Sequence, residues 1–85
     1  MSKKEILIKK LTRKPYPRNF TVRELDQLMN KCNCSKHAGG RGSSIAYVHT
    51  ATGRILQFDQ PHPGNNLYRY QIEKTKDFLV KIGEL

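Results

Sequence analysis

The clearest hydrophobic pattern in the chain lies in its first half, where apolar residues recur at helical spacing. Four of them fall on one face of a helix over residues 22–31: Val22, Leu25, Leu28 and Met29. Thr21 and Glu24 have the spacing of a capping box, and Phe20 precedes them at the position of a hydrophobic staple. The pattern therefore predicts a helix over 22–31 that begins after Thr21 and buries one side.

The second half of the chain has the shorter, alternating pattern of strands. Residues 34–37, 43–49 and 54–58 predict three strands, of which the second has the clearest alternation. A glycine-rich loop, 39–42, separates the first two strands, and a turn with Gly53 at positive φ joins the last two as a hairpin.

Helical spacing returns at both ends of the chain. Residues 70–82 predict a last helix, with Gly83 as its C-terminal cap. Residues 5–11 predict a short helix, although the apolar cluster at 6–8 is also compatible with a strand. Two prolines end this element, so residues 1–20 are expected to form a basic N-terminal extension with a proline linker, and residues 21–85 the main domain.

These elements predict an α+β fold in which two main helices cover one face of a three-stranded antiparallel sheet. With 85 residues the chain is expected to fold as one domain with too small a core for a deep cavity. The other face of the sheet is left to water or to a ligand. Any chemistry is therefore expected at a surface, with a large ligand supplying the second wall of the site.

Charge narrows the choice of that ligand. Sixteen Lys and Arg against seven Asp and Glu give a net charge of +9, and residues 1–36 carry ten of the basic and three of the acidic side chains. Such a surface favours a polyanion, and nucleic acid before an acidic protein or a membrane. The absence of an apolar run of membrane-spanning length, the lack of an export signal and the presence of only two cysteines predict a cytoplasmic chain with reduced thiols.

Four short motifs then follow in a characteristic order: 42–47 (Gly-Ser-Ser-Ile-Ala-Tyr), 53–55 (Gly-Arg-Ile), 61–64 (Pro-His-Pro-Gly) and 82–85 (Ile-Gly-Glu-Leu). Together they resemble the HicA toxins of bacterial toxin–antitoxin pairs over roughly residues 21–85. The resemblance implies a fold similar to double-stranded-RNA-binding domains. It also implies metal-independent cleavage of messenger RNA, no cofactor, and neutralisation by a HicB-type antitoxin.

One departure from this family concerns the catalytic residue itself. The family's catalytic histidine falls on Ser44, and a hydroxyl cannot take the proton of a ribose 2′-hydroxyl as an imidazole can. His37, His49 and His62 are the candidates to replace it, although each has a simpler interpretation as a turn or surface residue. An RNA-cleaving toxin is therefore the leading hypothesis. A catalytically silent RNA- or protein-binding module is the alternative, and a DNA-binding domain is a weaker one.

The expected RNA contacts surround the glycine loop and the hairpin. They are Lys31, Lys36, Arg41, Gly42, Ser43, Tyr47 and Arg54. Basic side chains and loop amides would contact phosphates, and Tyr47 would stack on a base or pack in the core. A zinc site at Cys32, Cys34 and His37 is not favoured, because a fourth ligand is not evident nearby.

Overall fold

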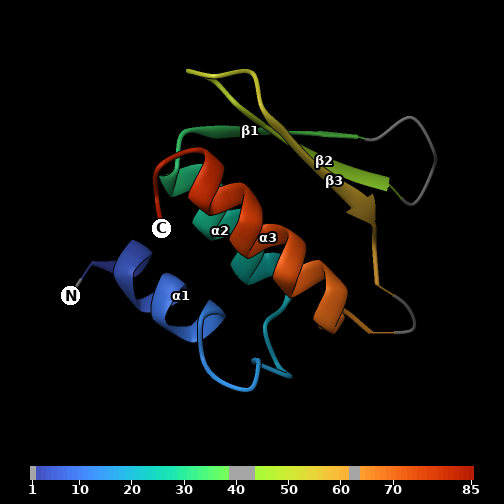
Figure 1. Ribbon diagram of the computed structural model, residues 1–85. Helices are drawn as coiled ribbons and strands as arrows, with labels where there is room; N and C mark the ends of the chain where they lie inside the picture. The colour runs from blue at the N-terminus through green and yellow to red at the C-terminus, as the bar shows by residue number, and fades with distance from the viewer. Residues whose placement is uncertain (1, 39–43, 62–63) are drawn as a thin grey trace.

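The computed structural model describes residues 2–38, 44–61 and 64–85, and within these ranges the chain forms three helices and three strands (Figure 1). In chain order they are α1 (Lys3–Leu11), α2 (Val22–Lys31), β1 (Cys34–Ala38), β2 (Ser44–His49), β3 (Ile55–Asp59) and α3 (Arg69–Lys81). The α+β class is confirmed, and the bounds of α2 are those that the hydrophobic spacing predicts. The N-terminal element is a helix rather than a strand.

The capping box at the start of α2 is formed in full. The backbone amide of Glu24 donates to Oγ1 of Thr21 at 3.1 Å, and the amide of Thr21 donates to Oε1 of Glu24 at 3.0 Å. At its other end the helix stops before Asn33, whose φ of 62° is left-handed. Asparagine is one of the few residues that adopts this conformation readily, so it ends the helix as glycine often does.

The sheet has the strand order β1-β2-β3, and both pairs are antiparallel. A tight turn joins β2 to β3, in which the amide of Gly53 donates to the carbonyl of His49 at 2.7 Å. Gly53 has φ +72°, and Gly83, which follows α3, has φ +83°. Both glycines therefore have the left-handed geometry expected from the sequence.

All three helices lie on one side of the sheet, with α2 and α3 against it and α1 beside α2 (Figure 1). Leu7 and Leu11 of α1 are 1% and 0% exposed and belong to the same core cluster as the apolar residues of α2, α3 and the sheet. The N-terminal segment is therefore a structural part of the domain rather than an appendage to it. Within the described ranges, no helix has both the length and the apolar character needed to cross a membrane.

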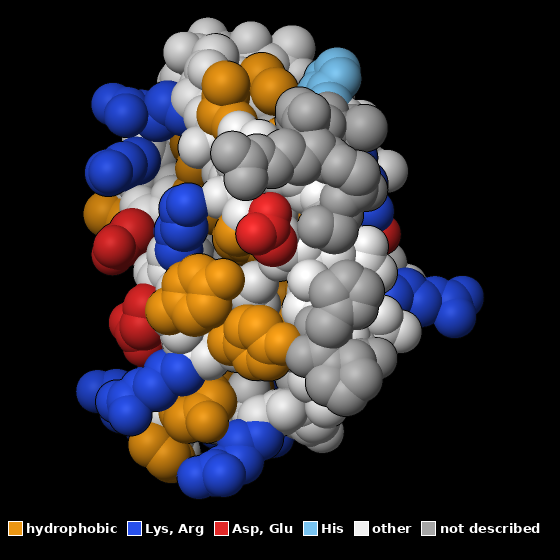
Figure 2. All heavy atoms as spheres, turned by 90° about the vertical axis from the view of Figure 1, so that its right-hand side faces the viewer, with side chains coloured by type: hydrophobic (Ala, Val, Ile, Leu, Met, Phe, Trp, Pro, Cys, Tyr) orange, Lys and Arg blue, Asp and Glu red, His pale blue; other side chains and the backbone are white. Residues whose placement is uncertain are grey.

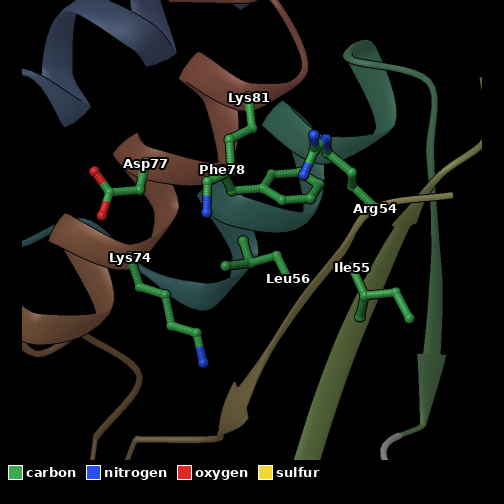
Figure 3. Close-up of a pocket in the computed structure, with 7 residues that line it drawn as sticks. All are labelled: Arg54, Ile55, Leu56, Lys74, Asp77, Phe78 and Lys81. Atoms are coloured by element: carbon green, nitrogen blue, oxygen red, sulfur yellow. The ribbon is translucent and has the colours of Figure 1, made fainter. Parts of the chain in front are cut away.

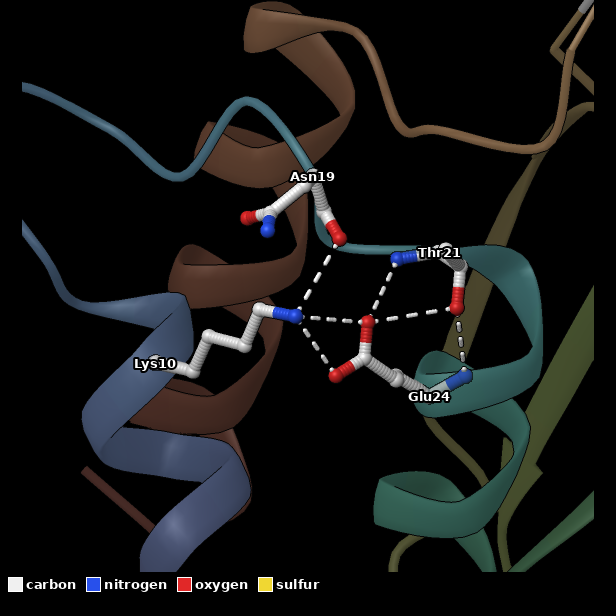
Figure 4. Close-up of polar contacts among 4 residues, drawn as sticks. All are labelled: Lys10, Asn19, Thr21 and Glu24. Atoms are coloured by element: carbon white, nitrogen blue, oxygen red, sulfur yellow. Dashed lines mark hydrogen bonds and ion pairs between the residues drawn. The ribbon is translucent and has the colours of Figure 1, made fainter.

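A polar contact reinforces the packing of α1 on α2. Nζ of Lys10 lies 2.9 and 2.8 Å from the two carboxylate oxygens of Glu24, and it also donates to the carbonyl of Asn19 at 3.2 Å (Figure 4). The carboxylate that caps α2 thus also binds α1. One side chain therefore stabilises both the helix terminus and the packing of the two helices.

Candidate functional site

The two faces of the sheet differ in what covers them. Side chains alternate between the faces of a strand, and in β3 Leu56 and Phe58 are buried whereas Ile55, Gln57 and Asp59 are exposed. The strand register extends this division to the whole sheet. We call the side without helices the open face; its residues are Ser35, His37, Ser44, Ala46, Val48, Ile55, Gln57 and Asp59. The covered face carries the alternate positions and packs against α2 and α3.

Ser44, the position at which the resemblance expects a catalytic histidine, lies on the open face. It is paired with Asp59 in the register, and Nε2 of Gln57 lies 3.4 Å from its hydroxyl oxygen. His37 lies on the same face, opposite Ala46, and is exposed. Because Ala46 is two residues from Ser44, His37 and Ser44 are diagonal neighbours, whose separation is typically about 7–8 Å. A phosphodiester group can be accommodated between side chains at that spacing.

The other two histidines do not join this pair in the described part of the chain. His49 lies on the covered face and is 8% exposed, and its Nδ1 is 2.8 Å from Oγ1 of Thr52. It therefore supports the β2–β3 turn, and its burial corrects the expectation that it could replace the catalytic histidine. His62 falls outside the described residues.

Tyr47 is a second correction. It is 1% exposed in the core, where its hydroxyl donates to Oδ1 of Asp26 on α2 at 2.5 Å. Burial and the neighbouring Asp26 carboxylate together raise the pKa of the Tyr47 phenol far above its ordinary value. A ring enclosed in this way cannot stack on a nucleobase, so the packing interpretation of Tyr47 is the correct one.

The expected basic residues do not form one cluster. Lys36 lies on the covered face and is paired with Asp26, with Nζ 3.0 Å from each carboxylate oxygen. Lys31 is exposed at the end of α2. Arg54 lies elsewhere, in a groove between β3 and α3. Three of the seven expected contacts, Arg41, Gly42 and Ser43, fall outside the described residues.

The β3–α3 groove adds two cations that the sequence interpretation missed, Lys74 and Lys81. Arg54, Lys74 and Lys81 line it around one carboxylate and an apolar floor (Figure 3); the other lining residues are Ile55, Leu56, Asp77 and Phe78. Nζ of Lys74 donates to the carbonyl of Gln57 at 2.6 Å, which holds α3 against β3. The seven-residue spacing of Lys74 and Lys81 on one helix face is the signal that could have identified this groove.

The two cysteines do not combine with His37. Cys32 is buried, and Cys34 lies on the covered face, whereas His37 lies on the open face. Burial raises the pKa of the Cys32 thiol to about 11, with a smaller contribution from the carboxylate of Glu84. In the described ranges no three His, Cys, Asp or Glu side chains are grouped as a metal site would require.

Comparisons with protein-family models, curated proteins and solved structures give no match to this chain. The geometry of the described residues and the four sequence motifs are therefore the grounds for a functional assignment. Within that geometry the open face is the place where a candidate base, a hydroxyl and an amide lie together on an accessible surface.

Proposed function

We propose that this chain is the RNA-cleaving toxin of a HicA-type toxin–antitoxin pair and that it acts on RNA at the open face. The observation that carries the proposal is that His37 shares this face with Ser44, the position at which the resemblance expects the catalytic histidine. The net charge of +9 supports a polyanionic ligand.

The order of the elements supports a fold similar to double-stranded-RNA-binding domains. Such a fold requires a helix, three antiparallel strands and a second helix on the same face, and α2, β1, β2, β3 and α3 have this order and arrangement. α1 is an addition to it. Domains of this kind recognise the shape and the 2′-hydroxyls of an RNA helix, so little sequence preference is expected.

The proposed reaction is an intramolecular transesterification. His37 takes the proton of a ribose 2′-hydroxyl, whose oxygen attacks the adjacent phosphorus, and the bond from phosphorus to the 5′-oxygen breaks. The leaving 5′-oxygen takes up a proton, so that the products are a 2′,3′-cyclic phosphate and a free 5′-hydroxyl. Ser44 and Gln57 orient the phosphate by hydrogen bonding. One imidazole has to take and return the proton, and a slow enzyme is therefore expected.

The test compares the wild-type chain with His37→Asn on a labelled RNA hairpin, with a metal chelator present throughout. We expect slow cleavage by the wild-type chain. In the variant the rate should fall roughly 10²-fold or more, because a positioned acid–base group contributes typically 10²–10⁴-fold. RNA affinity should be unchanged and should fall steeply with salt in both proteins. Equal cleavage by both proteins would exclude His37, and a wild type without affinity for RNA at low salt would overturn the proposal.

The second candidate is a binding module without catalysis, and Ser44 is the residue that favours it. If the family's imidazole is missing and His37 does not replace it, the open face binds RNA and leaves it intact. Affinity without cleavage in the wild-type chain, together with unchanged affinity in His37→Asn, would establish this function in place of the first.

The proposed protein partner is a HicB-type antitoxin that covers the open face. An acidic partner would complement the charge of the chain and block access of RNA to His37 and Ser44. Co-expression with the neighbouring reading frame should yield a stable complex and restore growth that the chain alone arrests. Separate purification of the two proteins under gentle conditions would contradict the pairing.

A further inference from the structure

Five residues from two distant parts of the chain meet where α3 begins. We call them the tyrosine–arginine cluster: Tyr16, Arg18, Tyr68, Arg69 and Tyr70. The guanidinium carbons of Arg18 and Arg69 lie 5.5 and 5.4 Å from the ring centroid of Tyr16. The rings of Tyr68 and Tyr70 are stacked, with centroids 6.1 Å apart. Tyr16, Arg18, Tyr68 and Arg69 thus line one shallow pocket, and Tyr70 adjoins it through its stacking on Tyr68.

The cluster presents this chemistry to solvent. Tyr68 is 44% and Tyr70 58% exposed. No carboxylate in the described part of the chain forms an ion pair with Arg18 or Arg69. Figure 2 views the molecule from the side at which α3 begins, and apolar side chains gather in the lower half of this face with Lys and Arg side chains around them. The cluster can therefore offer both a stacking surface and positive charge that no neighbouring carboxylate neutralises.

Backbone hydrogen bonds hold the segments that carry the cluster. The amide of Leu67 donates to the carbonyl of Phe20 at 2.8 Å, and the amide of Val22 donates to the carbonyl of Asn65 at 2.9 Å. The amide of Tyr68 donates to Oε1 of the buried Gln71 at 2.9 Å. The backbone around the aromatic surface is therefore anchored before any ligand binds, which lowers the entropic cost of binding.

Gln71 also connects the cluster to the end of the open face. Its Nε2 donates to the carbonyl of Asp59 at 2.8 Å and lies 3.4 Å from the hydroxyl of Tyr70. Asp59 is the register partner of Ser44. The exposed tyrosines thus lie next to the end of the sheet at which Ser44 stands.

We propose that the tyrosine–arginine cluster binds unpaired nucleotides of the RNA, next to the segment held on the open face. Bases stack on Tyr68 and Tyr70, and Arg18 and Arg69 contact the phosphates that accompany them. This inference rests on the proposed function and defines its substrate further, as RNA in which a single-stranded segment adjoins the cleaved bond. An acidic protein segment would make use of the arginines but would not need exposed, stacked rings beside them.

Two double variants separate the contribution of the aromatic rings to RNA binding from that of the rest of the side chains. Tyr68→Leu/Tyr70→Leu removes the aromatic faces, whereas Tyr68→Phe/Tyr70→Phe keeps them. Binding of a fluorescent oligouridine and of a blunt RNA duplex is measured by anisotropy. For the leucine pair we expect affinity for the oligouridine to fall roughly 5- to 150-fold for each stacked base, with affinity for the duplex unchanged. The phenylalanine pair should bind both RNAs as the wild-type chain does.

A charge control accompanies this comparison. Arg18→Gln/Arg69→Gln and Lys9→Gln/Arg13→Gln remove the same charge, but the second pair lies on α1 and just beyond it. The first pair should weaken oligouridine binding more than the second. Equal losses would show that only the net charge matters and would overturn the role of the arginines.

The outcomes also distinguish this inference from the proposed function. If the wild-type chain binds RNA and the leucine pair binds oligouridine equally well, the cluster is not a nucleotide site, and the proposed function stands without it. If the leucine pair keeps its RNA affinity but no longer forms the complex with the antitoxin, the surface docks a protein. If the wild-type chain binds neither RNA, both proposals are overturned.

Discussion

The two faces of the sheet use similar residue types for different purposes. On the covered face, polar side chains have partners close by: Tyr47 and Lys36 both contact Asp26, and His49 contacts Thr52. On the open face, Ser44 has only the long 3.4 Å contact with Gln57 among its described side-chain hydrogen bonds. Polar groups on the covered face are therefore committed to structure, whereas those on the open face remain available to a ligand.

The difference shows that the face of the sheet to which a strand residue points decides the role of its side chain. His37 and His49 were both candidates for the role of the histidine that the resemblance expects, yet one lies on each face. Tyr47 and Ser44 lie three residues apart on the same strand, and only Ser44 lies on the open face. A strand residue of a suitable type is thus a candidate for ligand contact on this sheet only when the register places it on the open face.

The largest effect is expected from adding an imidazole to the open face. Ser44→His should raise the cleavage rate by up to roughly 10²–10⁴-fold, because a second acid–base group can then protonate the leaving oxygen while His37 acts as the base. The rate is measured on the RNA hairpin under chelating conditions. Ile55→His is the matched control, since it adds the same side chain to the same face but on β3, which is not adjacent to the strand that carries His37.

The control should leave the rate close to that of the wild-type chain. Equal stimulation by both substitutions would mean that any imidazole on this face assists cleavage, and Ser44 would lose its special position. No change in either variant, with RNA binding retained, would support the silent binding module.

A smaller effect, on stability alone, is expected at the covered face. Tyr47→Phe removes the hydrogen bond to the Asp26 carboxylate and should lower the free energy of unfolding by about 1.5–3 kcal/mol, the usual range for bonds to charged groups. Urea denaturation measures this change. Gln57→Ala on the open face is the comparison, and it should cost less than about 0.5 kcal/mol because the side chain is exposed.

RNA affinity should change in the reverse pattern in the same two variants. Tyr47→Phe should bind RNA as the wild-type chain does once both are folded, whereas Gln57→Ala should bind it more weakly. A loss of RNA affinity in Tyr47→Phe without a loss of stability would contradict the division between the two faces.

Much of the architecture follows from local sequence signals. The helical spacing and the capping box predicted α2 within its observed bounds, and Gly53 and Gly83 marked positions of positive φ. The three strands and α3 were predicted to within a residue or two at their ends. These features depend on neighbours in the chain, and local patterns are therefore sufficient to predict them.

The candidate site was predicted less well because it depends on contacts between distant segments. Lys36 is paired with Asp26, ten positions earlier in the chain, and no local pattern shows that pairing. Likewise, Tyr16 and Arg69 are more than fifty positions apart, so the tyrosine–arginine cluster appears only when the chain is folded. Sequence motifs identified Ser44, but the strand register was needed to select His37 as its neighbour.

The smallest effect is expected far from the open face, at the contact between α1 and α2. Partial burial of Glu24 acts to raise the pKa of its carboxyl group, but hydrogen bonds from Lys10 and Thr21 outweigh it and hold the pKa below the ordinary value of 4.5. A carboxyl group whose pKa is lower in the folded chain stabilises the fold above its unfolded pKa. That stabilisation is lost as pH falls through the folded pKa.

Stability should therefore decline from about pH 5 downward, and Lys10→Met should remove part of this decline. At neutral pH the substitution should cost about 1 kcal/mol or less, since partly exposed ion pairs contribute little. Lys9→Met is the matched control, because it removes the same charge from the exposed side of α1. Urea denaturation of the three proteins at pH 7 and pH 3.5 makes the comparison.

If Lys9→Met reduced the loss of stability at low pH as much as Lys10→Met, general repulsion in a chain of net charge +9 would explain the decline. RNA affinity at pH 7 should be equal in the two variants, because Lys10 is engaged by Glu24 on the helical side of the molecule.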